Sequence, residues 1–171
     1  MEIMKLFRNI FLSLIATFAI ISAVTYTSCS KHNKCLNVKC LNDGACNEGS
    51  CICPVGFEGT NCELFSRDKF ISNYNGGDSC AVDTLAETRY PIHVTARIFN
   101  PKEFLIKNFL ANQFDSAVAT MTATDSFTML GANNSVTYTG RGFLRKDTIQ
   151  IYYNVAHDTI SYNCHYVGLV Y

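Results

Sequence analysis

The distribution of apolar and polar positions divides the chain into three unequal parts. An apolar run from Ile10 to Val24 follows the basic residues Lys5 and Arg8. Residues 35–63 contain few apolar side chains and many cysteines. In the rest of the chain, apolar and polar residues alternate over several short stretches, which is the period of a half-buried β-strand. The pattern therefore predicts a leader segment, a core-poor module and a β domain.

The alternating stretches predict a meander of short strands. The residues expected to share one face in three of them are Ile92, Val94, Ala96 and Ile98; Ala117, Ala119, Met121 and Ala123; and Ile149, Ile151, Tyr153 and Val155. Turn residues separate the stretches at Asp125, 131–134, 146–147 and 157–158, and 75–78 is interpreted as another turn because of its two glycines. Residues 64–171 are therefore expected to form an antiparallel β barrel or sandwich.

Two segments leave the element type open. In 101–110, Pro101 and Glu103 could start a helix, but Asn-Pro is also a turn signal and the neighbouring segments favour strands, so a strand is preferred. Residues 68–74 could form a short helix or a first strand that plugs one end of the barrel.

Composition and charge exclude two classes of protein. Hydrophobic residues make up 48% of the chain, which is enough for a core and excludes wholesale disorder. Lys and Arg number 14, as do Asp and Glu, so the balanced charge argues against a basic nucleic-acid binder.

The leader has the length and flanks of a signal peptide. As a helix the apolar run would span about 22 Å, less than the roughly 30 Å core of a bilayer, which favours a signal segment over an uncleaved anchor helix. The sequence Tyr26-Thr27-Ser28-Cys29 then resembles the lipobox of bacterial lipoproteins, in a loose form typical of Bacteroidetes, although Tyr26 stands where an aliphatic residue is usual.

That resemblance implies a signal peptide over 1–28, a lipid on Cys29 and a short tether over 29–34. The protein would be exported and held by its N-terminal lipid to a membrane of the cell envelope, at the outer membrane or facing the periplasm. The chain has nine cysteines, and removing Cys29 leaves the even number expected of an exported protein. The alternative is that Cys29 is an unpaired or intermolecular thiol.

Six cysteines between Cys35 and Cys62 form a disulfide framework. A segment so poor in apolar residues needs crosslinks for stability, but spacing alone leaves many pairings open. The ending CICPVGFEGTNC over 51–62 resembles the epidermal growth factor-like (EGF-like) module, with the resemblance covering 35–63. This resemblance implies the pairs Cys35–Cys46, Cys40–Cys51 and Cys53–Cys62. By elimination, Cys80 pairs with Cys164.

No metal or other cofactor is expected. Closely spaced cysteines can bind zinc, but the export signal favours disulfides. Calcium-binding members of the EGF-like family carry carboxylates ahead of the first cysteine. Here residues 30–34 contain two lysines and no carboxylate, so no calcium site is predicted.

The β domain resembles small lipocalin-like barrels of bacterial lipoproteins through three short motifs. They are Ile106-Lys107-Asn108-Phe109, Gly140-Arg141-Gly142 and the strand-like DTIQIYY over 147–153. The resemblance implies a barrel whose interior could hold a small ligand, although the domain is shorter than full lipocalins.

Reactive chemistry is sparse in the sequence. The four histidines, His32, His93, His157 and His165, lack metal spacing, and no nucleophile motif is present. Tyrosines gather in the last third and suit either a barrel core or a binding face; they are Tyr138, Tyr152, Tyr153, Tyr162, Tyr166 and Tyr171. Four Asp-Ser/Thr-aliphatic sequences resemble bacterial glycosylation sites; they begin at Asp83, Asp115, Asp147 and Asp158.

The sequence is therefore interpreted as a non-enzymatic, lipid-anchored envelope protein. The EGF-like module would be a stalk that presents a β-barrel or sandwich domain to a protein or glycan partner. One alternative is a small-ligand carrier, which needs a cavity of at least about 300 Å³. A less favoured one is a glycan-acting enzyme using carboxylates such as Asp125 and Asp158, which would have to lie about 5–10 Å apart.

Overall fold

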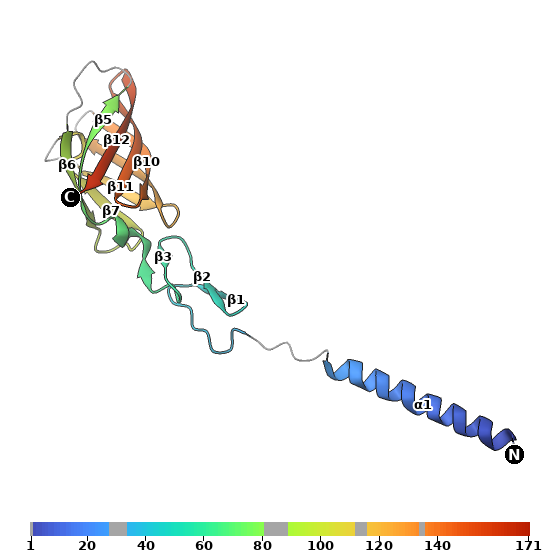
Figure 1. The fold of residues 1–171 in the computed structure, drawn as a ribbon. Coiled ribbons are helices and arrows are strands. Elements are labelled where there is room, and N and C mark those ends of the chain that lie inside the picture. The colour runs from blue at the N-terminus through green and yellow to red at the C-terminus, as the bar shows by residue number, and fades with distance from the viewer. Residues whose placement is uncertain (1, 28–33, 81–88, 112–115, 134–135) are drawn as a thin grey trace.

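A small disulfide-bonded module joins a closed β barrel in the structure, a computed structural model that describes residues 2–27, 34–80, 89–111, 116–133 and 136–171 (Figure 1). The expected fold class, mainly β with a disulfide-stapled module and an antiparallel β domain, is confirmed, and the domain is a barrel.

Helix α1 (Glu2–Thr27) covers the segment predicted as a signal peptide. Its described apolar side chains are exposed, with Phe7 70% and Phe11 67% accessible. Within the part of the chain that the structure describes, no helix combines the length and hydropathy needed to cross a bilayer. Cys29 and the predicted tether, apart from Lys34, lie outside the described residues.

The module is two small hairpins held by crosslinks. Strand β1 (Ala45–Asn47) pairs with β2 (Ser50–Ile52), and β3 (Phe57–Glu58) pairs with β4 (Leu64–Phe65). Three disulfides join Cys35 to Cys46, Cys40 to Cys51 and Cys53 to Cys62, the pairs that the EGF-like resemblance implies. Of residues 34–63, only Gly56 and Cys62 are buried, so burial contributes little to this part of the fold.

The barrel is a continuous antiparallel meander. Its strands are β5 (Asn73–Cys80), β6 (Arg89–Ala96), β7 (Glu103–Lys107), β8 (Ser116–Met121), β9 (Ser126–Asn133), β10 (Val136–Arg145), β11 (Thr148–His157) and β12 (Ile160–Val170). Each strand pairs with the next, and β12 pairs with β5 to close the barrel. Closure leaves no free strand edge. The segment 101–110 contributes a strand, as preferred.

Aromatic side chains fill both ends of the barrel interior. The 3₁₀ helix η1 (Ser66–Phe70) places the fully buried Phe70 at the end nearer the module, where its ring centroid is 5.2 Å from that of Phe104 and 5.4 Å from that of Phe127. The turn η2 (Phe109–Ala111) places Phe109 at the other end, 4.7 Å from the ring of Tyr153. Residues 68–74 thus include the expected plug, which is helical.

The sequence prediction of a turn at 75–78 is wrong, because these residues lie inside β5. Gly76 allows close packing, because a Cβ there would lie 2.0 Å from the Val167 carbonyl oxygen. In the paired strand the Tyr166 ring lies across Gly168, and its hydroxyl donates to the carbonyl oxygens of Tyr74 and Tyr90, each at 3.3 Å. Close packing between strands, not chain reversal, explains the glycine at position 76.

Other predicted boundaries shift by a few residues. Strand β9 continues through Asn133, so the turn expected at 131–134 begins later than predicted. Strand β6 ends at Ala96, and Ile98, expected on the buried face, is 86% exposed in the following turn. Ala123 also lies in a turn, beyond the end of β8.

The module and the barrel are connected by more than a linker. The β3–β4 hairpin crosses the boundary predicted between residues 63 and 64. Lys69 Nζ lies 2.7 Å from Glu58 Oε2 across the junction. The buried guanidinium of Arg67 donates to the carbonyl oxygens of Arg97, Asn100 and Glu103, which fixes the β6–β7 turn against the chain entering the barrel.

Candidate functional site

Antiparallel register places a row of side chains across the outside of the barrel. Thr128 of β9 lies opposite Arg141 of β10, Arg141 opposite Tyr152 of β11, and Tyr152 opposite His165 of β12. Alternate residues of a strand face the same side, and the intervening residues Met129, Ile151, Tyr153 and Tyr166 are buried inside. We call the outward-facing side of these four strands the β9–β12 face.

Four planar groups stack across this face. The Arg145 guanidinium lies 5.2 Å from the Phe143 ring centroid, and the Phe143 and Tyr152 rings are 6.1 Å apart. The Tyr152 and His165 rings are 4.0 Å apart and nearly parallel, at 7°. Ring faces are therefore covered by neighbours, while Tyr152 remains 41% exposed. The stack holds Tyr152 rigid and leaves its edge and hydroxyl available.

Polar side chains beside the stack are held by hydrogen bonds to one another. Asn154 Nδ2 donates to Asn163 Oδ1 at 3.1 Å, and Ser161 Oγ donates to Asn154 Oδ1 at 3.0 Å. The Tyr152 hydroxyl lies 3.4 Å from Gln150 Oε1. These amides and hydroxyls are arranged before any ligand binds, which reduces the entropy lost on binding.

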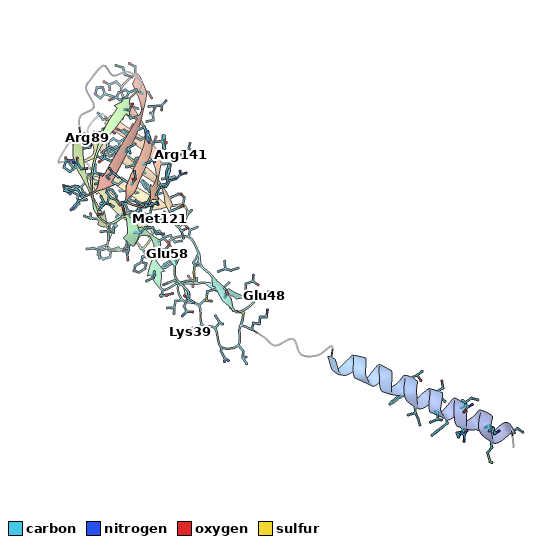
Figure 2. The ribbon with its side chains drawn as sticks, viewed as in Figure 1. Lys39, Glu48, Glu58, Arg89, Met121 and Arg141 are labelled. Carbon is cyan, nitrogen blue, oxygen red and sulfur yellow. A yellow bond between two sulfur atoms is a disulfide. The ribbon has the colours of Figure 1, made fainter. Side chains whose placement is uncertain are left out.

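Two adjoining grooves run along the row. Their volumes are about 530 and 580 Å³, and both are lined by Thr128, Arg141 and Tyr152. The first extends over Ser126 and Phe143, and the second over Thr139, Asn154 and Asn163. Figure 2 shows Arg141 on the side of the barrel formed by the orange and red strands. Both grooves are open to solvent and suit an extended ligand better than an enclosed one.

A buried polar cluster lies inside the barrel, near the Cys80–Cys164 disulfide that crosslinks β5 and β12. The Asp78 carboxylate accepts a hydrogen bond from the Tyr90 hydroxyl. Burial raises the pKa of Asp78, and the hydroxyls of Tyr90 and Tyr153 partly oppose this. Among the described residues, Asp78 Oδ1 and the Tyr153 hydroxyl have no hydrogen-bond partner within normal distance.

The tyrosines around this carboxylate stay neutral at physiological pH. Burial, followed by the charge of Asp78, raises the pKa of Tyr90, Tyr153 and Tyr166, and burial raises that of Tyr74 to about 12. The cluster offers one carboxylate and neutral donors. Among the described residues, no group of three or more His, Cys, Asp or Glu side chains is placed to hold a metal ion.

The candidate residues named from the sequence are mostly kept apart. Asp125 lies in the β8–β9 turn and Asp158 in the β11–β12 turn, which the antiparallel topology places at opposite ends of the barrel. His93 lies opposite Asn73 and His165 opposite Ser79, six residues along β5, while His157 ends β11 beside Asp158, 3.6 Å away. These residues form neither a carboxylate pair nor a histidine cluster.

The tyrosines divide between the two sides of the barrel wall. Tyr138, Tyr153 and Tyr166 are buried, Tyr162 is half-buried, and Tyr152 and Tyr171 are exposed. The Asp147 and Asp158 sequences begin in the turns after β10 and β11 and continue into the strands that follow. His32, the Asp83 sequence and Asp115 lie outside the described residues, while the Asp115 sequence continues into β8 at Ser116.

Sequence reasoning did not identify Arg141 or Asp78 as candidate residues. Arg141 lies between two glycines in a short strand motif, and Asp78 lies in a segment predicted as a turn, so neither residue type stands out in the sequence. The usable signal was the outward alternation of β10 and β11, but their register is needed to place Arg141 beside Tyr152.

Comparison with known proteins identifies no relative, since no family model, curated protein or solved structure matches the chain. The interpretation of the two candidate sites therefore depends on their own chemistry.

Proposed function

We propose that this protein is a non-enzymatic, lipid-anchored component of the cell envelope whose barrel binds a glycan on the β9–β12 face. The EGF-like module is its stalk, and Cys29 carries the lipid. The observation that carries the binding proposal is the row of Thr128, Arg141, Tyr152 and His165, flanked by two open grooves.

A glycan fits this face better than a protein partner does. Sugars present many hydroxyl groups, each of which must be matched by a donor or acceptor. The second groove supplies hydroxyl and amide side chains from Thr128, Thr139, Asn154 and Asn163. The centre of a stable protein interface is instead apolar and closely packed.

Binding is tested on the full-length protein in detergent micelles with an array of bacterial and host oligosaccharides. Tyr152→Phe keeps the ring stack and removes the hydroxyl, while Tyr152→Ala removes both. We expect the alanine variant to bind the selected glycan at least tenfold more weakly, and the phenylalanine variant to show a smaller loss.

The matched control is His93→Ala, which changes an outward-facing aromatic side chain on β6, away from the β9–β12 face. Circular dichroism verifies that each variant is folded. Absence of any glycan bound by the wild type, or unchanged binding by Tyr152→Ala, would overturn the proposal.

The anchor is tested separately by metabolic labelling with palmitate. We expect labelling of the wild-type chain and none of Cys29→Ala. Cys80→Ala is the control, because it removes a different cysteine and should leave labelling intact. Equal labelling of wild type and Cys29→Ala would refute the anchor without bearing on glycan binding.

A lipocalin-like carrier is the second candidate, favoured by the spare carboxylate oxygen of Asp78 inside the barrel. An eight-stranded barrel can either be filled by side chains or hold one small ligand. Here Phe70, Phe109 and the buried tyrosines occupy much of the interior. This packing favours the outer face as the principal binding surface.

A further inference from the structure

The charges on the β9–β12 face indicate what kind of glycan it binds. We infer that the ligand is an acidic glycan, and that Arg141 pairs with its carboxylate or sulfate group. This inference rests on the proposed function and names the ligand class for the same site.

The first observation is the absence of acidic residues. None of the four strands β9, β10, β11 and β12 contains an Asp or a Glu, although the chain has 14 of them. Nearby carboxylates such as Asp125, Asp147 and Asp158 lie in the turns at the barrel ends. An anion that approaches the middle of the face therefore meets no like charge from these strands.

The second observation is that Arg141, unlike three other arginines of the chain, has no partner within the part of the chain that the structure describes. Arg67 is buried against three carbonyl oxygens, and Arg97 is paired with Glu103 at 2.7 Å. Arg145 lies over the Phe143 ring. Arg141 is exposed and has no ion-pair or hydrogen-bond partner among the described residues, although it lines both grooves.

The third observation is what surrounds Arg141. A guanidinium presents donors in a planar fork that matches a carboxylate or sulfate in two-point contact. In the barrel register its neighbours across the strands are Thr128 and Tyr152, whose hydroxyls can bind the uncharged part of the same sugar. The amide pair Asn154–Asn163 lies along the second groove and can bind the next sugar.

Together these features distinguish an acidic sugar from other anions. A phosphate or chloride ion would need only the charge of Arg141. An extended acidic oligosaccharide also uses the two grooves and the prearranged hydroxyl and amide groups beside it. Because the charge pair is exposed, binding should weaken as ionic strength rises.

The test uses full-length protein in micelles and isothermal titration with three probes. They are oligogalacturonate for the carboxylate, sulfated dextran oligosaccharide for the sulfate, and unmodified dextran oligosaccharide as the neutral counterpart. We expect at least one acidic probe to bind tenfold or more tightly than the neutral one, with affinity that falls as salt is added.

Variants separate a specific charge pair from general attraction. Arg141→Gln should reduce acidic-probe affinity about tenfold and flatten its salt dependence, while Arg141→Lys should retain the salt dependence and lose part of the affinity. Lys107→Gln removes the same charge from β7, outside this face, and should bind like the wild type.

The experiment distinguishes failure of this inference from failure of the proposed function. Suppose that acidic and neutral probes bind with equal affinity and that Tyr152→Ala binds neither. This result would overturn the assignment of an acidic ligand but would leave the proposed glycan binding intact. If Arg141→Gln and Lys107→Gln lost the same acidic-probe affinity, or if polyglutamate bound as tightly as the acidic probes, the specific pairing of Arg141 with an acidic sugar would be overturned. No binding of any sugar by the wild type would overturn the proposed function itself.

Discussion

The module and the barrel reach stability by different physical routes. Residues 34–63 have three disulfides and bury only Gly56 and Cys62, whereas the barrel has one disulfide and a continuous buried core. Crosslinks stabilise a fold mainly by restricting the unfolded chain, and burial does so by removing apolar surface from water. The same chain thus combines a part held by covalent bonds with a part held by packing.

The crosslinks themselves differ between the two regions. The module disulfides close loops with sequence separations of 11, 11 and 9, while Cys80–Cys164 spans 84 residues. In the chain-entropy model the longer loop gains more per bond. The barrel, however, already pairs β5 with β12 through backbone hydrogen bonds. The module has few other stabilising contacts and therefore depends more on its disulfides.

The largest expected effect comes from truncating the barrel core. The Phe127 ring packs 5.0 Å from Phe104 and 5.4 Å from Phe70, in space that a side chain at Gly142 would occupy. Phe127→Ala should lower the free energy of unfolding of the barrel by about 3–5 kcal/mol, because it removes apolar contacts and leaves a cavity. Urea denaturation followed by circular dichroism measures this loss.

Leu130→Ala is the matched control for this core substitution. Leu130 lies on the same strand but is 62% exposed, so its truncation should change stability by no more than about 0.5 kcal/mol. If the two variants unfolded at the same urea concentration, the account of a barrel held by packing would be wrong.

Removal of a module disulfide should lower the free energy of unfolding somewhat less than Phe127→Ala does, and only within the module. The double variant Cys40→Ser/Cys51→Ser should destabilise the module by about 2–4 kcal/mol. Hydrogen exchange should then show loss of protection at the β1–β2 hairpin, with the β11–β12 amides still protected.

The barrel pair Cys80→Ser/Cys164→Ser serves as the comparison for this experiment. Its removal should lower the melting temperature of the barrel while the strands remain paired. If the β11 and β12 amides of the module variant also lost protection, the two regions would unfold as one unit. This would contradict the conclusion that the module and the barrel are stabilised separately.

The smallest expected effect concerns pH and the buried carboxylate. Because burial raises the pKa of Asp78 above 3.8, the folded barrel binds this proton more tightly than the unfolded chain. The contribution of Asp78 to stability is therefore greatest below the ordinary carboxyl pKa and is lost as pH rises through the raised value. Asp78→Asn should remove this component, measured by urea denaturation across acidic and neutral pH.

Asp125→Asn provides the control, since Asp125 is an exposed turn residue. Its pH profile of stability should run parallel to that of the wild type. If the Asp78→Asn profile also ran parallel to the wild type, the carboxylate would titrate alike in the folded and unfolded states, contrary to a raised pKa of Asp78 in the folded barrel.

The barrel interior was largely predictable because strand alternation is a local property. Ile149, Ile151, Tyr153 and Val155 all face inward as the two-residue period predicted. The structural role of glycines was harder to predict, since it depends on residues that are distant in the chain. Gly131, within β9, leaves room for the Tyr138 ring, since a Cβ there would fall 1.8 Å from that ring, a contact that no local pattern reveals.

The candidate site was predictable only in its residue types. The sequence indicated tyrosines suited to a binding face, and alternation separated the inward Tyr153 from the outward Tyr152, but it could not place Tyr152 between Arg141 and His165. The alignment of Arg141 with Tyr152 and His165 follows from the lengths of the β10–β11 and β11–β12 turns, which set the register. Small changes in turn length would move Arg141 out of this row.

The entry of the chain into the barrel has a mechanical consequence. If tension is applied to the barrel through the module, the force passes through β4 and η1 to the first residue of β5 and begins to peel that strand from its neighbours. Tearing can proceed along β5 only as far as Cys80, where the bond to Cys164 transfers the load to β12. The disulfide thus prevents further separation of the strands at the end of β5, the strand that carries the tension.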